Sequence, residues 1–295
     1  MRLCERLAWG LVPAAPVPFR GRTLAADAQD AYARWMAQYD VAGVAVWAHT
    51  GRGPHLSADQ RATVLATWRA ALPGGVVVAG VSSPALARDA RLGGADAVLA
   101  FPRADDPVAY HQALGRELPV IAFYLYAAAG GVPYDDDTLH RILALPAVAG
   151  IKVATLDSVP TFQRIAAVAR DYPDKLLVTG EDRFLASSIR MGARAALVGL
   201  GAALPDLQAG LLRAFRDGAG TEVARLAALL EGFAAATFAD PVEGYVRRML
   251  WAAAAEGAIP DDACDDPWGP ALDPRGRPRI EALVRAARAA TRGGD

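Results

Sequence analysis

Two lysines are the first feature of the sequence that could do unusual chemistry. The chain has 31 basic residues, of which only Lys152 and Lys175 are lysines and the other 29 are arginines. Lys175 follows the turn-forming residues Tyr172-Pro173-Asp174, so we expect it in a solvated loop. Lys152 lies instead in the apolar segment VAGIKVA (148–154), which is typical of a buried strand.

A lysine in such a segment has two interpretations. Burial lowers the pKa of an amine, and a neutral amine can attack a carbonyl carbon and form a Schiff base, whereas arginine stays charged. Alternatively, Lys152 is structural, with its stem along the end of the strand and its ammonium group in water or beside an acid. The first interpretation requires that the amine face a substrate site.

Composition and charge argue against several classes of protein. The 295 residues are 53% hydrophobic with a formal net charge of −1 and no long basic block, which argues against nucleic acid or an anionic membrane surface as a partner. The N-terminal segment lacks the apolar core of a signal peptide, and no stretch of about 18 apolar residues indicates a membrane span. Cys4 and Cys264 lie far apart, which favours free thiols and provides no metal-ligand spacing. We therefore expect a cytoplasmic protein.

Short apolar runs alternate with longer amphipathic segments along most of the chain. Continuous apolar strands that are separated by helices are typical of a parallel sheet covered by helices. Eight such units predict an α/β fold, a closed (β/α)8 TIM barrel. An open doubly wound sheet is the alternative, but its glycine-rich nucleotide fingerprint is missing after the first strand. The predicted strands are 9–19, 43–49, 75–81, 97–101, 119–126, 148–154, 176–180 and 196–200.

The alternation gives way to helical patterns alone near the end of the barrel. We assign 1–218 to the barrel and 219–295 to a C-terminal helical extension, which the proline- and aspartate-rich loop 260–279 interrupts. Active sites of such barrels lie at the carboxyl ends of the strands, so Lys152 is aimed where substrates bind. The other side chains that this rule places at the mouth are His49, Thr50, Tyr124, Tyr126, Glu181 and Asp182.

Five segments are similar, in order and position, to those of one known family. They are GVAVWAHTGRGPHLSADQR, GGADAVLAFP, LPVIAFYLY, VAGIKVATLDS and LLVTGEDRFLASSIRMGARAALVG. Through them the chain resembles, over essentially its whole length, a divergent member of the dihydrodipicolinate synthase and N-acetylneuraminate lyase family of class I aldolases. The resemblance implies that Lys152 forms an imine with pyruvate or another 2-oxo acid, and that no metal or other cofactor takes part.

The resemblance also implies roles for residues around the lysine. Tyr124 matches the tyrosine of the fifth strand that relays protons, provided that the strand has a one-residue irregularity. Counting from Pro119 places Phe123 there instead, and a buried structural tyrosine is the alternative role for Tyr124. Thr50 matches a threonine that holds the substrate carboxylate. The remaining substrate-binding positions are Gly51, Gly180 and Leu197.

Several positions depart from the family pattern. His49 stands where a threonine is expected and Arg52 where a glutamate is expected. We interpret His49 either as a base or proton relay, or as a histidine that is merely hydrogen-bonded in its loop. Ala129 replaces the arginine that would bind a carboxylate of the second substrate, and Arg103 and Ala104 stand where a tyrosine would cross a dimer interface. These changes disfavour the reaction of lysine biosynthesis.

The sequence therefore predicts a Schiff-base-dependent aldolase, lyase or dehydratase that acts on a 2-oxo acid and an aldehyde-type second substrate. The alternative is a catalytically weakened barrel that binds a 2-oxo or sugar acid as a sensor. A third hypothesis is phosphate binding by VGLGAAL (198–204), although the glycines there also suit closure of the last strand. The usual assemblies of the family imply a homodimer or homotetramer.

Overall fold

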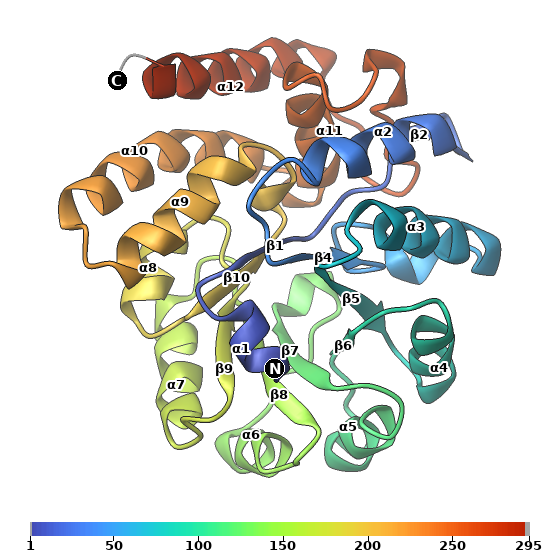
Figure 1. Ribbon diagram of the computed structural model, residues 1–295, viewed down its shortest axis with the longest axis vertical. Coiled ribbons are helices and arrows are strands. Elements are labelled where there is room, and N and C mark those ends of the chain that lie inside the picture. The colour runs from blue at the N-terminus through green and yellow to red at the C-terminus, as the bar shows by residue number, and fades with distance from the viewer. Residues whose placement is uncertain (1, 293–295) are drawn as a thin grey trace.

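Eight parallel strands form the centre of the computed structural model, which describes residues 2–292. They are β1 (Leu11–Pro13), β4 (Gly43–Val46), β5 (Val76–Val81), β6 (Ala97–Ala100), β7 (Val120–Leu125), β8 (Val148–Ala154), β9 (Leu176–Thr179) and β10 (Ala195–Val198). The sheet has the order β1-β10-β9-β8-β7-β6-β5-β4. A parallel bridge between Ala14 and Ala45 joins its two edges, so the sheet closes into the barrel seen in Figure 1. The predicted (β/α)8 fold is confirmed.

Helices follow the strands and cover the outside of the barrel (Figure 1). Within residues 2–292, none of the helices is both long enough and apolar enough to cross a lipid bilayer. A hairpin of β2 (Phe19–Arg20) and β3 (Thr23–Leu24) precedes the first covering helix. The covering helices are α2 (Ala26–Met36), α3 (Ala58–Ala71), α4 (Pro84–Leu92), α5 (Pro107–Leu114), α6 (Asp136–Leu143), α7 (Val159–Arg170), α8 (Leu185–Arg190) and α9 (Pro205–Arg216).

Side chains alternate between the barrel interior and the layer under the helices, as the pleat of a strand requires. On β7, Ile121, Phe123 and Leu125 belong to the interior cluster, whereas Ala122 and Tyr124 pack in the outer layer. The N-terminal helix α1 (Leu3–Leu7) adds Leu7 to the interior cluster. In Figure 1 this helix lies across one end of the barrel, which leaves the opposite end for a site.

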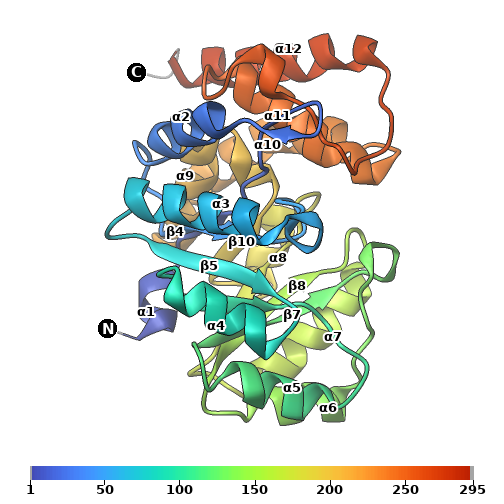
Figure 2. The ribbon, with the colours of Figure 1, turned by 90° about the vertical axis from the view of Figure 1, so that its right-hand side faces the viewer.

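The C-terminal extension stacks at one end of the molecule (Figure 2). Its helix α10 (Gly220–Thr237) packs on α9, and α12 (Arg277–Arg292) packs on both α10 and α11 (Tyr245–Ala255). Between α11 and α12 the chain returns to the β2–β3 hairpin, where Asp265 forms an antiparallel bridge to Phe19. Short 3-10 helices are η1 (Gly53–His55), η2 (Ala127–Ala129), η3 (Leu200–Ala202), η4 (Val242–Gly244), η5 (Asp261–Ala263) and η6 (Pro274–Gly276).

Candidate active site

A pocket opens at the carboxyl ends of the strands, the end at which barrel enzymes hold their active sites. Its volume is about 440 Å³, including the part that is open to solvent. Strands β7 and β8, the segments after β4, β9 and β10, and the C-terminal extension all contribute to its wall. Among the lining residues are Lys152, Phe123, His49, Thr50, Asp182 and Tyr245.

Lys152 projects into this pocket from β8. Its Nζ lies over the Phe123 ring, 4.3 Å from the ring centroid. Gly180 leaves room for the lysine stem, since a Cβ at that position would lie 2.5 Å from Lys152 Cε. The side chain is buried, and burial lowers the pKa of the amine to about 8, although the Asp182 and Glu181 carboxylates act in the opposite direction. About one tenth of the amine is therefore neutral at pH 7.

Two acidic side chains follow β9 and contribute groups that titrate near neutral pH. Glu181 is fully buried; its Oε1 accepts hydrogen bonds from the Thr155 backbone N–H (2.5 Å) and hydroxyl (2.9 Å). Its Oε2 has no hydrogen-bond partner within residues 2–292. Asp182 Oδ1 accepts a hydrogen bond of 2.6 Å from the Leu200 N–H. Burial raises the pKa of both carboxyl groups to about 7, so both are partly protonated at neutral pH.

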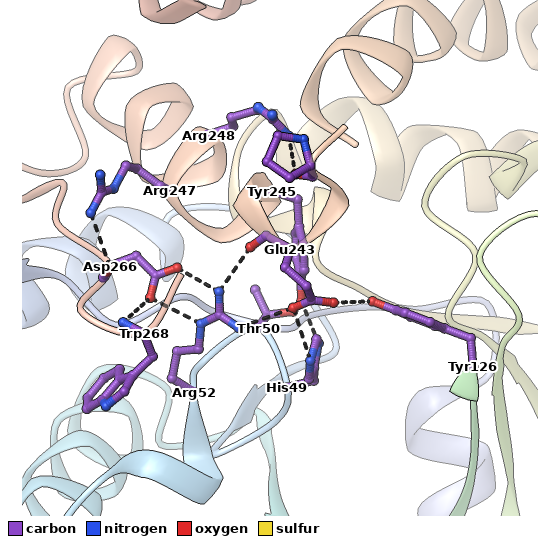
Figure 3. A network of polar contacts seen from close by, with 11 residues as sticks. His49, Thr50, Arg52, Tyr126, Glu243, Tyr245, Arg247, Arg248, Asp266 and Trp268 are labelled. Carbon is purple, nitrogen blue, oxygen red and sulfur yellow. Dashed lines mark hydrogen bonds and ion pairs between the residues drawn. The ribbon is translucent and has the colours of Figure 1, made fainter. Parts of the chain in front are cut away.

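A network of polar contacts forms one wall of the pocket (Figure 3). The Tyr245 hydroxyl lies 3.0 Å from Thr50 Oγ1 and 3.1 Å from His49 Nδ1. On its other side, His49 Nε2 lies 3.4 Å from Glu243 Oε2. The Tyr126 hydroxyl donates a hydrogen bond of 2.8 Å to Glu243 Oε1. The network therefore joins the loop after β4 and the end of β7 to the C-terminal extension.

The His49 imidazole in this network is neutral at physiological pH. Burial lowers its pKa to about 4 even though the Glu243 carboxylate favours the charged form. A neutral imidazole has one N–H donor and one acceptor nitrogen. Placed between a hydroxyl and a carboxylate, His49 can accept a hydrogen bond at one nitrogen and donate at the other.

Arg52, at the position where the resemblance implies a glutamate, has a structural partner. Its Nε and Nη2 donate to the two carboxylate oxygens of Asp266 at 3.1 and 2.7 Å. It also donates to Glu243, at 3.3 Å to the carboxylate and at 3.0 Å to the backbone carbonyl. The side chains of Arg52 and Asp266 are only 8% and 1% exposed. The bidentate pair thus fastens the C-terminal extension to the loop that carries His49 and Thr50.

The structure corrects the register expected for the strand that carries Tyr124. The pairing of β7 with β8 skips Ala149, so that Phe123 lies opposite Lys152. Residues paired in this way share a face of the sheet, and Tyr124 therefore points toward the covering helices. Its hydroxyl lies 3.5 Å from the Arg164 guanidinium of α7 and outside the pocket. Phe123, not Tyr124, occupies the position beside the lysine.

The other expected site residues divide into two groups. His49, Thr50 and Gly180 lie in the pocket wall with Lys152. Gly51 and Leu197 do not line the pocket. Gly51 is buried in its loop, where a Cβ would lie 2.9 Å from a backbone carbonyl oxygen, and Leu197 is fully buried in the barrel interior.

Sequence reasoning missed the part of the site that comes from the C-terminal extension. Phe238 and Tyr245 line the pocket, and Glu243 contacts His49 behind them. From the sequence, we expect this extension only to contribute helices that pack on the barrel. The one available signal is the short segment PVEGY (241–245), which places an acid and a tyrosine at the start of a helix and matches no motif.

Comparisons with known proteins point to one family. Residues 9–287 match the family described as Dihydrodipicolinate synthetase family. A protein of Chloroflexus aurantiacus described as an uncharacterized DapA-like lyase is 28% identical over 229 residues, which cover 71% of this chain and 75% of that protein.

Solved structures of similar shape include three enzymes. Dihydrodipicolinate synthase from Oceanobacillus iheyensis has a TM-score of 0.83 at 20% identity, covering 97% of this chain and 98% of that chain. N-acetylneuraminate lyase from Mycoplasma synoviae has a TM-score of 0.78 at 18% identity, covering 96% and 98%. A catalytic lysine mutant of Ruminococcus gnavus sialic acid aldolase has a TM-score of 0.85 at 19% identity, covering 98% and 99%. At these identities the likeness shows a shared fold.

The Arg52–Asp266 pair predicts a large effect on stability. Asp266→Ala leaves a buried guanidinium without its bidentate partner, so we expect the free energy of unfolding to fall by about 3–5 kcal/mol. The matched control is Glu222→Ala, which removes the carboxylate of an exposed ion pair with Arg225 and should cost about 1 kcal/mol or less. Denaturant unfolding of both variants checks the difference. Equal losses would show that the buried pair does not stabilise the C-terminal extension.

Proposed function

The chain belongs to the dihydrodipicolinate synthetase family, and from this premise we propose that it is a Schiff-base-forming aldolase or lyase for pyruvate or another 2-oxo acid. The observation that carries the proposal is the buried amine of Lys152 at the barrel mouth, with a pKa lowered to about 8. The catalytic lysine of the Ruminococcus gnavus aldolase, on the same fold, supports it.

In the proposed reaction the neutral amine attacks the carbonyl carbon of the 2-oxo acid. Water leaves, and the resulting imine withdraws electrons from the neighbouring carbon, so that a carbon–carbon bond at this carbon can form or break. Thr50, with its hydroxyl in the pocket wall, is the proposed contact for the substrate carboxylate. Lys152 is the nucleophile of this scheme, and Phe123 forms an apolar wall beside it.

We expect the second substrate to lack a carboxylate. Ala129 stands in η2 where a carboxylate-binding arginine is expected. Arg183 lines the pocket but lies 3.7 Å from the Asp157 carboxylate, with which it forms an ion pair. Asp182, also in the pocket wall, would repel a second anion when it is ionised. An uncharged aldehyde fits this environment better than an anionic one.

Reductive trapping tests the nucleophile. Pyruvate with cyanoborohydride should attach one reduced pyruvate unit to the Lys152 peptide, as read by peptide mass spectrometry. Lys152→Arg keeps the charge but lacks the nucleophilic amine, so labelling should vanish while the fold remains. Lys175→Arg is the matched control, because Lys175 lies outside the pocket and donates to the Leu145 carbonyl at 3.3 Å. Labelling of Lys175 alone, or of neither lysine by pyruvate and several other 2-oxo acids, would contradict the proposal.

The lowered amine pKa predicts a pH dependence. Only the neutral amine attacks, and the neutral fraction rises with pH until the pKa of about 8 is passed. The initial rate of imine trapping should therefore rise about tenfold between pH 6 and pH 7 and level off above about pH 9. Trapping rates measured across this range, with Lys152→Arg as the blank, check the prediction. A rate that still climbs past pH 10 would indicate an amine with an ordinary pKa.

The missing arginine predicts poor use of aspartate semialdehyde. With pyruvate and this aldehyde, we expect a kcat/KM well below the ordinary enzymatic range of about 10⁴–10⁸ M⁻¹ s⁻¹, although imine trapping with pyruvate proceeds. A coupled assay, run beside a panel of uncharged aldehydes, gives the comparison. Efficient turnover of aspartate semialdehyde would show that another residue binds its carboxylate.

One observation favours a second candidate function, that of a sensor for 2-oxo or sugar acids. Phe123 has no hydroxyl at the position opposite Lys152, so β7 provides no proton carrier there. Imine formation without turnover of any aldehyde in the panel would favour the sensor. Turnover of an aldehyde would favour the enzyme.

A further inference from the structure

The proposed reaction needs a proton carrier that β7 does not supply. Removing a proton from the carbon next to the imine requires a base, and returning it requires an acid. Phe123 lies opposite Lys152, and the Tyr124 hydroxyl lies outside the pocket beside Arg164. The carrier has to come from other side chains in the pocket wall.

Tyr245, in the first turn of α11, lines the pocket. Its ring stacks on Phe238 with centroids 4.6 Å apart, and its hydroxyl lies 3.0 Å from Thr50 Oγ1. A Cβ at Gly199 would lie 3.0 Å from Tyr245 Cε2 and 3.1 Å from Thr50 Oγ1. The same point is 3.6 Å from Asp182 Oδ1, so these groups gather at one place in the wall. Burial raises the pKa of Tyr245, which keeps the phenol protonated.

His49 connects this phenol to a carboxylate. Its Nδ1 lies 3.1 Å from the Tyr245 hydroxyl, and its Nε2 lies 3.4 Å from Glu243 Oε2. As a neutral imidazole, His49 can accept the tyrosine proton at Nδ1 while it donates its own proton at Nε2. The Glu243 side chain is 36% exposed, so a proton that reaches it can pass to water.

The second tyrosine near this network serves a different purpose. The Tyr126 hydroxyl donates to Glu243 Oε1 at 2.8 Å, which directs its proton toward the carboxylate. Arg52 holds the other Glu243 oxygen at 3.3 Å. Both contacts position Glu243 against His49, while Tyr245 is the hydroxyl that contacts the other nitrogen of His49.

We propose that Tyr245, His49 and Glu243 form a proton relay between the Lys152 imine and solvent. This inference rests on the proposed function. In the forward step, the C–H bond on the carbon next to the imine breaks, its electron pair forms the C=C bond of an enamine, and the C=N π pair moves to nitrogen. The released proton goes to the Tyr245 oxygen as the phenol proton moves to His49 Nδ1. The Nε2 proton moves to Glu243 and then to water, and the reverse sequence returns a proton to carbon.

The test follows pyruvate alone, so no second substrate is needed. In D₂O the relay exchanges the methyl hydrogens of pyruvate for deuterium, which proton NMR detects. Tyr245→Phe should slow this exchange by about 10²–10⁴-fold, the usual contribution of a positioned acid or base. Cyanoborohydride trapping at Lys152, carried to completion, should still label this variant. Tyr124→Phe is the matched control, since it removes a hydroxyl outside the pocket, and should exchange at the wild-type rate.

Glu243→Gln is a second variant, because it keeps a polar side chain but cannot pass a proton on; it should slow exchange at least about tenfold. If Tyr245→Phe does not fold, as judged by circular dichroism, Glu243→Gln decides alone. The relay is overturned if wild type forms the imine and the folded variants exchange within about threefold of it, or if wild type forms the imine without exchange. A wild-type protein that traps no pyruvate would instead overturn the proposed function.

Discussion

The buried ion pair between Arg52 and Asp266 is the contact on which the pocket depends. It joins the loop after β4 to the C-terminal extension, two parts of the chain that the barrel alone would not bring together. Desolvation of both groups is costly, and the bidentate geometry offsets that cost. Through the additional bonds from Arg52 to Glu243, the pair also sets where Tyr245 meets His49. The pocket wall is therefore built jointly by the loop after β4 and by the C-terminal extension.

Desolvation also sets the chemistry inside the pocket. It lowers the pKa of Lys152 to about 8 and raises the pKa of Asp182, in the pocket wall, to about 7. It also raises to about 7 the pKa of Glu181, which is fully buried and does not line the pocket. Burial thus moves the pKa values of one base and two acids toward pH 7, and near that pH each group can take up or release a proton. Phe123 and the close approach of the backbone at Gly180 keep the lysine in this dry environment.

The fold could be predicted from sequence because its signals are local and repeated. Eight apolar runs between amphipathic helices identify the strands, and Lys152 at the end of one run identifies the mouth. The register around Tyr124 could not be predicted, since skipping Ala149 in β8 depends on pairing between strands. The positions of Glu243 and Tyr245 near the pocket could not be predicted either, because they depend on how the C-terminal helices pack on the barrel. Long-range packing leaves no periodic pattern in the sequence.

The order of the chain adds a consequence for biosynthesis. All eight strands precede Glu243 and Asp266, so a ribosome completes the barrel sequence before it makes the residues that cover the mouth. During this interval Arg52 has no Asp266 to pair with, and an unpaired guanidinium stays in water rather than in a protein interior. Burial of Arg52 is therefore unfavourable until Asp266 is present. The pocket wall is complete only when the C-terminal extension has been translated and has docked on the barrel.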